Sequence, residues 1–186
     1  LSQYYGAKDF ENLRKSLAHS YRLTAFIAAG VLILSQSFAS LVLTGLHTPS
    51  NIIGMSLLYL RIIFCGIPAT AAYNMFASAL RAMGNSKTPL TAMIIASVLN
   101  VSLDILFVAG FGWGVAGAAI ATVIAQSFSA VYCFLILRRI DIVHLTRADF
   151  MPASGMNARL MKLGIPVVFQ NIIIGVGGLV VQYVIN

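Results

Sequence analysis

The sequence predicts an all-α membrane protein, a polytopic bundle of five transmembrane helices. Hydrophobic residues make up 59% of the 186 residues and charged residues only 9%, whereas a soluble domain carries about 25% charged residues. The apolar residues gather in runs long enough to cross a bilayer. The basic residues gather in alternate connections between those runs, as they do in membrane proteins. Together these observations favour lipid as the main solvent of the chain.

Five apolar runs reach the length of about 20 residues that a membrane-spanning helix needs. In lipid every backbone polar group must find a partner within the protein, which leaves helices and closed barrels as spanning structures. Continuous runs of this length lack the alternating pattern of a barrel strand. The predicted spans are Leu23–Leu46, the stretch between Arg61 and Arg81, Pro89–Phe111, Val115–Leu137 and Leu163–Asn186.

The basic residues predict the orientation of these spans. Eleven of the twelve Lys and Arg residues lie before the first span, between the second and third, or between the fourth and fifth, and only Arg61 lies in an alternate connection. Positive charge collects on the cytoplasmic side of a membrane protein. We therefore expect the lead-in 1–22 and the linker 140–162 to be cytoplasmic, in a multi-pass protein of the cell inner membrane. The net charge of +7 then reflects topology, so we expect the bilayer and not nucleic acid as the partner.

Small residues predict how the fourth span packs. Gly110–Gly114 is a very short turn, so the third and fourth spans must be antiparallel neighbours, and Trp113 within it suits the outer interface. A ridge of small side chains follows at four-residue steps, which favours close helix packing. Its members are Gly117, Ala121, Ala125 and Ser129.

The sequence contains no set of residues that predicts catalysis. There is no glycine-rich phosphate loop, no Ser/His/Asp set and no cysteine spacing typical of zinc. Cys65 and Cys133 both lie in apolar runs, where a thiol behaves as a small hydrophobic side chain. We therefore expect a protein that is not an enzyme and that needs no cofactor.

Asp104 is the one acid inside any predicted span. A charge at the centre of a membrane helix costs about 2.5–3.5 kcal/mol, so such residues are usually functional. Asn100 lies four residues earlier, on the same helical face. Oxygen ligands of this kind suit a hard cation such as sodium, and because burial favours the neutral form of a carboxyl, a proton is the alternative. A structural carboxylate that bonds to neighbouring helices is the competing interpretation.

Other polar residues inside the spans predict a polar cavity around this acid. Thr122 and Gln126 share a face of the fourth span, and Asn74 follows Pro68, which can kink the second span. Hydrogen bonding between helices could explain each of them singly. The candidates for lining the cavity are Asn74, Gln126 and Gln36.

Several motifs of the chain resemble the multidrug and toxic compound extrusion (MATE) family of transporters. The run Leu80–Pro89 resembles the loop after the family's fourth helix, and Leu99-Asn100-x-x-Leu103-Asp104 resembles its fifth. Gly114–Thr122 resembles the start of the sixth helix. Gln3–Ala7 and Lys162–Pro166 resemble the loop before the third helix and the entry to the seventh.

The resemblance implies a two-lobe fold of about twelve helices, of which this chain holds the third to the seventh. Residues 1–139 would be part of the first lobe, 140–162 the linker and 163–186 the first helix of the second lobe. Both ends then look cut, and the rest of the chain would be a partner of this piece. Asp104, Asn100 and Thr122 match the cation ligands of the family, which also uses an acid on a first helix absent from this sequence.

The predicted function is secondary active efflux of organic, often cationic, drugs or toxic compounds in exchange for sodium ions or protons. One alternative is a flippase of the same superfamily that moves lipid-linked oligosaccharides, whose cavity typically carries basic residues to meet phosphate. The other is a membrane scaffold that transports nothing. A scaffold would have no need for Asn100 and Asp104 on one helical face.

Overall fold

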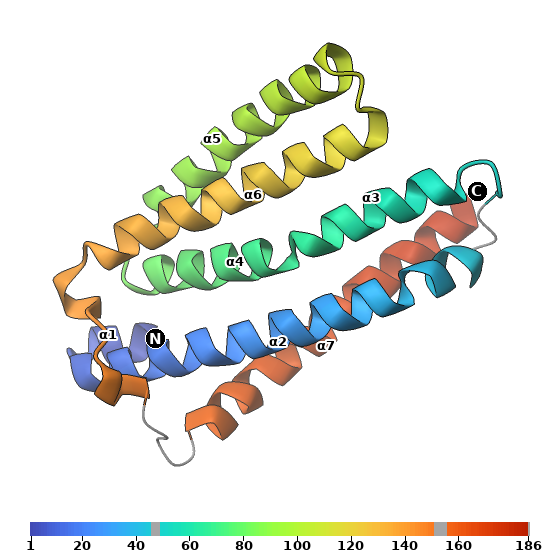
Figure 1. Cartoon of the computed structure of the whole chain (residues 1–186). Helices are drawn as coiled ribbons and strands as arrows, with labels where there is room; N and C mark the ends of the chain where they lie inside the picture. The colour runs from blue at the N-terminus through green and yellow to red at the C-terminus, as the bar shows by residue number, and fades with distance from the viewer. Residues whose placement is uncertain (46–48, 151–155, 186) are drawn as a thin grey trace.

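The computed structural model describes residues 1–45, 49–150 and 156–185. They form a bundle of long helices (Figure 1). The elements are α1 (Ser2–Gly6), α2 (Phe10–Gly45), α3 (Ile53–Cys65), α4 (Ile67–Ala82), α5 (Lys87–Asp104), the π-helix η1 (Ile105–Gly110), α6 (Gly114–Arg138), the 3₁₀ turns η2 (Asp141–Val143) and η3 (Arg147–Phe150), and α7 (Met156–Ile185).

Four helical stretches of the described chain are long and apolar enough to cross a membrane, as the first four predicted runs require. They are Phe10–Gly45, Ile53–Ala82, Lys87–Gly110 and Gly114–Arg138. The fifth predicted run overlaps α7, and its last residue, Asn186, lies outside the described residues. The described apolar stretch of α7, Leu160–Ile174, is shorter than a membrane span. The helical fold is thus confirmed, and the fifth crossing stays a prediction.

The predicted start of the second span was wrong. Arg61 was taken as its boundary, but α3 begins eight residues earlier, at Ile53, and Arg61 lies within the helix with its side chain exposed. A long arginine side chain can extend its guanidinium away from an apolar helix surface, so one such charge does not end a helix. No Lys or Arg is then left in the two connections opposite the basic ones.

The helix α6 is the centre of the bundle and packs against α3, α4 and α5. All four members of the predicted small-residue ridge are buried in it. Gly117 lies so close to η1 that a Cβ atom there would be 2.9 Å from the Cβ of Phe107. The ridge therefore works as a packing surface, which confirms the interpretation of its spacing.

The second span bends at Gly66, between α3 and α4. The Gly66 N–H bonds to the Ile63 carbonyl, a tighter turn than in an α-helix, and Pro68 has no N–H to donate. A Cβ atom on Gly66 would lie 3.0 Å from Val123 of α6. The bend predicted from Pro68 is present, and glycine lets it approach α6 closely.

The first part of the predicted linker 140–162 packs onto the bundle. Val143 of η2 is buried in a cluster with Leu17 of α2, Leu80 of α4 and Leu137 of α6. The helix α7 starts at Met156, before the predicted linker ends. Buried apolar area, which the polar sequence of the segment does not reveal, attaches it to these helices.

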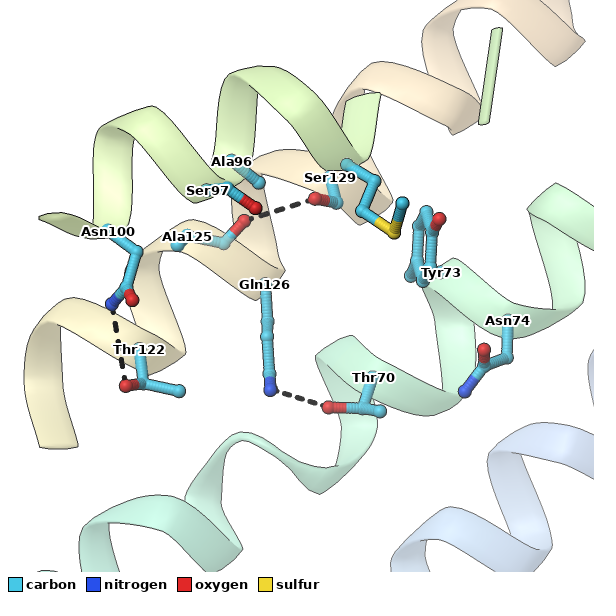
Figure 2. A pocket seen from close by; sticks show the side chains of 11 residues that line it. Thr70, Tyr73, Asn74, Ala96, Ser97, Asn100, Thr122, Ala125, Gln126 and Ser129 are labelled. Atoms are coloured by element: carbon cyan, nitrogen blue, oxygen red, sulfur yellow. Dashed lines mark hydrogen bonds between the residues drawn. The ribbon is translucent and has the colours of Figure 1, made fainter. Parts of the chain in front are cut away.

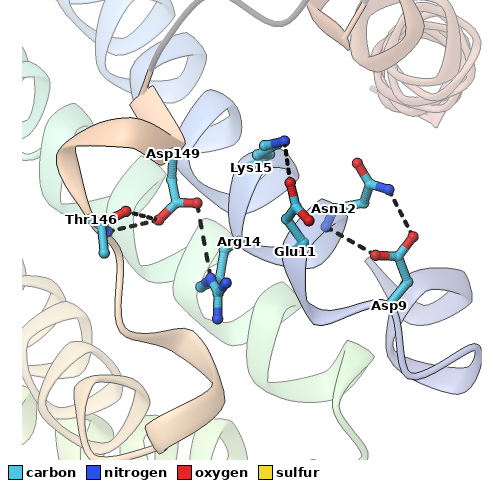
Figure 3. A network of polar contacts seen from close by, with 7 residues as sticks. All are labelled: Asp9, Glu11, Asn12, Arg14, Lys15, Thr146 and Asp149. Atoms are coloured by element: carbon cyan, nitrogen blue, oxygen red, sulfur yellow. Dashed lines mark hydrogen bonds and ion pairs between the residues drawn. The ribbon is translucent and has the colours of Figure 1, made fainter.

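A buried carboxylate also holds this segment in place (Figure 3). Asp149 is 5% exposed. It accepts hydrogen bonds of 2.7 and 2.8 Å from the backbone N–H and hydroxyl of Thr146, and it pairs with Arg14 of α2 at 3.9 Å. Burial by itself raises the pKa of Asp149, but these hydrogen bonds and the Arg14 charge outweigh it, and the pKa lies below its ordinary value.

Candidate transport site

A polar pocket of about 330 Å³ lies between α4, α5 and α6, and we call it the side pocket (Figure 2). The three helices contribute alternating polar and small apolar side chains to its wall. Of the six candidate site residues from the sequence, it brings together Asn74, Asn100, Thr122 and Gln126. The other lining residues are Thr70, Tyr73, Met93, Ala96, Ser97, Ala125 and Ser129.

Asn100 and Thr122 meet at one end of the side pocket. The Asn100 Nδ2 donates to the Thr122 hydroxyl over 3.5 Å, and that hydroxyl donates in turn to the Ala118 carbonyl over 3.0 Å. A hydroxyl offers one donor and two acceptor lone pairs. One lone pair of Thr122 therefore stays available for a further ligand.

Asp104 lies one helical turn beyond Asn100 and outside the lining of the side pocket. Its Oδ1 atom is buried and has no hydrogen-bond partner within the described chain. A buried oxygen without a partner is rare in native structures, because burying it costs free energy that no bond returns. Such an atom is placed to accept a cation or to hold a proton.

The chain changes its helical geometry directly after Asp104. Residues Ile105–Gly110 form the π-helix η1, which sequence reasoning missed. Short π-helices often occur at functional sites, because the wider turn re-aims the neighbouring side chains. A π-helix leaves no periodic pattern in six residues, so the sequence held no signal that would have revealed it.

A second, larger pocket of about 860 Å³ lies between α2, the α3–α4 bend, α6 and α7, and we call it the central pocket. Its wall is mostly apolar, with small polar groups such as Thr24 and Ser78. Thr70, Asn74 and Gln126 line both pockets. The Thr70 hydroxyl donates to the Gln126 carboxamide over 2.5 Å, so this pair stands where the two pockets meet.

Gln36 lies apart from both of these pockets. Its Nε2 donates to the backbone carbonyl of Arg61 over 2.9 Å and to the Cys65 thiol over 3.3 Å. Gln36 therefore joins α2 to the end of α3, next to the bend. Its polarity inside a span is explained by a bond between helices, the alternative that the sequence left open.

The sequence reasoning did not single out Thr70 and Ser97 of the side pocket. Each precedes an identified residue by one turn: Thr70 lies four residues before Asn74, and Ser97 three before Asn100. That spacing puts each pair on one helical face. It is the signal in the sequence that points to Thr70 and Ser97. Small hydroxyl residues are common in membrane helices, so the signal is weak.

Among the described residues, the lining of the two pockets carries no Lys, Arg, Asp or Glu side chain. Within the described ranges, no three His, Cys, Asp or Glu side chains come together as metal ligands. One helical turn before Asp104 stand the Asn100 amide and the Thr122 hydroxyl to which that amide donates. A set of this kind suits a hard, weakly held cation better than a transition metal.

Similarity to a known protein family shows to which family the chain belongs. The model of the MatE family matches residues 1–106. The chain belongs to the MatE family. Among curated proteins, the chain is similar to the probable multidrug resistance protein YpnP of Bacillus subtilis (strain 168), with 32% identity over the whole chain. The multidrug export protein MepA of Staphylococcus saprophyticus is 25% identical over 98% of the chain.

Solved structures of MatE transporters share the fold. An inward-facing multidrug resistance transporter of the MOP superfamily superposes with a TM-score of 0.82 at 24% identity, over 89% of this chain and 38% of that chain. A MOP superfamily transporter from Pyrococcus furiosus superposes with a TM-score of 0.81 over 89% of this chain and 37% of that chain. The chain spans 42% of YpnP and 41% of MepA. It therefore corresponds to less than half of these transporters.

Proposed function

We propose that the chain belongs to a secondary active exporter, which moves organic, often cationic, compounds out of the cell as sodium ions or protons enter. The observation that carries the proposal is the buried, unpartnered Oδ1 of Asp104, one turn from the Asn100–Thr122 pair. Family membership supports the transport class, and the names of YpnP and MepA support drugs as cargo.

The ion would bind at Asp104. Its carboxylate supplies the charge, the Asn100 amide an oxygen and the Thr122 hydroxyl its remaining lone pair. A proton would need the carboxylate alone, and it would remove the cost of the buried charge. In either case binding favours the arrangement of α5 and α6 that brings these oxygens together, and release favours the other arrangement.

The exported compound would bind in the central pocket. Its volume of about 860 Å³ suits a drug-sized molecule, since ligand pockets usually measure about 300–1,000 Å³. The mostly apolar wall favours an organic body, and Asn74, Thr70 and Gln126 offer hydrogen bonds to polar groups. In transporters with internal repeats, rocking of one helix bundle against the other opens such a pocket to each side in turn.

The lining of the pockets argues against the flippase alternative. A lipid-linked oligosaccharide carries phosphate, which needs positive partners such as Arg or Lys. Neither pocket has a basic side chain among the described residues of its lining. A neutral, apolar wall with amide and hydroxyl groups fits neutral or cationic compounds better. Arg61 lies on α3 but does not line either pocket.

The test replaces Asp104 by Asn in the intact gene product that contains these residues. The variant keeps the size and hydrogen bonding of the side chain but loses its charge. We expect it to insert and fold normally but to lose ion-coupled export, whereas Asn100→Ala and Thr122→Ala weaken export less. The measurement is efflux per folded molecule at several sodium concentrations and pH values. Wild-type export with unchanged ion dependence in Asp104→Asn would refute the assignment.

A structural carboxylate would give a different pattern from a coupling carboxylate. In that case Asp104→Asn would lose expression or thermal stability in proportion to its loss of export. Ser102→Ala is a matched control, because Ser102 lies on the same helix and donates only to the Val98 carbonyl of its own turn, over 2.8 Å. We expect its export and its ion dependence to stay at the wild-type level.

A further inference from the structure

A third pocket, of about 330 Å³, lies at the end of the bundle where the basic residues gather. We propose that it binds the phosphate head group of an anionic phospholipid. This site is separate from both transport pockets and does not depend on the proposed export function. It lies where the end of α6 meets α2 and the segment that follows η2. We call it the head-group pocket.

The basic part of its wall comes from Arg138 and His144. Arg138 is the last residue of α6 and is exposed. Within the described chain no carboxylate lies within ion-pair distance of its guanidinium. His144 has Asp141 at 3.6 Å, and Asp141 is fully exposed to solvent. The local charge is therefore positive at Arg138, and an arginine without a carboxylate partner is suited to bidentate contact with phosphate.

The rest of the wall is aromatic and aliphatic. Phe134 lies one turn before Arg138 on α6, and Tyr21 comes from α2, two residues before its apolar run starts. Leu137, Val143 and Leu145 complete the wall. The pocket thus crosses the boundary between the apolar span and its polar flank. Aromatic residues with an apolar ring are typical of this boundary in membrane proteins.

This combination favours a lipid over free phosphate. A free phosphate ion would contact Arg138 but gain nothing from Phe134 and the aliphatic wall. A phospholipid places its phosphate and its first acyl carbons at adjacent depths, which matches the order of Arg138 and Phe134 along α6. Basic pockets between membrane helices are known to bind anionic head groups in this manner.

The neighbouring residue Arg139 provides a matched control. It has the same charge, is also exposed and follows directly after Arg138, but it does not line the pocket. If the two arginines only help to orient the protein in the membrane, their replacements should behave alike. If the pocket binds a head group, only the replacement of Arg138 should reduce the binding of anionic lipid.

The experiment compares the intact gene product in nanodiscs of dioleoyl phosphatidylglycerol and of dioleoyl phosphatidylcholine. The readouts are the midpoint of thermal unfolding and the number of lipids retained in native mass spectrometry. We expect phosphatidylglycerol to raise the midpoint and Arg138→Gln to weaken its retention about fivefold, since one basic contact at the membrane surface is of that magnitude. Arg139→Gln should retain the lipid as the wild type does.

Two further measurements control for misfolding of the variant and distinguish a lipid head group from free phosphate. Arg138→Lys keeps the charge but loses the bidentate fork, so we expect it to retain more phosphatidylglycerol than Arg138→Gln and less than the wild type. Inorganic phosphate added to the phosphatidylcholine discs should leave the midpoint unchanged. Equal losses in Arg138→Gln and Arg139→Gln, or a rise of the midpoint with inorganic phosphate equal to that with phosphatidylglycerol, would overturn the proposal.

Discussion

Thr70 of α4 and Gln126 of α6 are joined by a hydrogen bond of 2.5 Å where the side pocket and the central pocket meet. The same Thr70 hydroxyl lies 3.2 Å from the Gly66 carbonyl at the bend of the second span. A side chain at Gly66 would be crowded, because its Cβ would lie 3.0 Å from both Val123 of α6 and the Ile63 carbonyl. The bend, the contact between the helices and the boundary of the pockets therefore depend on one another.

We expect Thr70→Val to destabilise the protein by about 0.6 kcal/mol, the average for hydrogen bonds between membrane helices. Valine keeps the shape but removes the donor to Gln126. The measurement is equilibrium unfolding in detergent with increasing sodium dodecyl sulfate. Thr44→Val is the control, because the Thr44 hydroxyl bonds to the Ser40 carbonyl of its own helix. An equal loss in both variants would show that the bond between α4 and α6 contributes nothing.

Because α6 packs closely on η1, the stability of the protein should be sensitive to substitution of Gly117. We expect Gly117→Ala to destabilise the protein by about 1–3 kcal/mol, the usual cost of overpacking a filled interior, because the new Cβ would lie 2.9 Å from the Cβ of Phe107. Thermal unfolding of purified protein checks it. In Gly30→Ala the new methyl group would meet nothing within 4 Å, so stability should hold or rise slightly. Unchanged stability in Gly117→Ala would contradict the packing described here.

Because Asp149 is buried and holds the segment from η2 to η3, the attachment of that segment to the bundle should weaken in acid. Its pKa in the folded protein is lowered, so its stabilising effect is present above the unfolded value of about 3.9 and is lost as the pH falls through the lower folded value. The protection of the backbone amides of residues 141–150, which is the ratio of their intrinsic to their observed exchange rate at the same pH, should therefore fall in acid. In Asp149→Asn this protection should already be low at neutral pH.

The control for this experiment is Asp141→Asn. Asp141 is fully exposed and pairs only with His144, at 3.6 Å, so we expect exchange in the segment to match that of the wild type across the pH range. An acid dependence that survives in Asp149→Asn would mean that another group attaches the segment to the bundle.

The basic residues predict the side of the membrane on which each connection lies. We expect Lys87 and Arg147 to face the cytoplasm and Trp113 to lie at the outer surface. Single cysteines at positions 87 and 113 test this, in a background where Cys65 and Cys133 are replaced. An impermeant maleimide applied to whole cells should label position 113 only. Labelling of position 87 from outside would show that the orientation is the reverse of the one predicted.

The apolar runs of the sequence predicted the helices well because the bilayer leaves a chain few alternatives. Four of the predicted spans overlap membrane-length helices of the structure over nearly their whole length. The small-residue ridge of α6 was also predicted correctly, because close packing requires small side chains at four-residue steps. The start of α3 was missed, since an exposed Arg61 interrupts hydropathy without interrupting the helix.

The sequence determined which polar residues stand inside the spans, and among them Asp104 as the single acid. Only the tertiary structure decided what each of them meets. Gln126 reaches Thr70 at the pockets, whereas Gln36, equally polar, bonds to the backbone of Arg61. The rotation and spacing of the helices set these partners, and they depend on close contacts such as those at Gly66 and Gly117. Such contacts join residues distant in the chain, so no local pattern of the sequence records them.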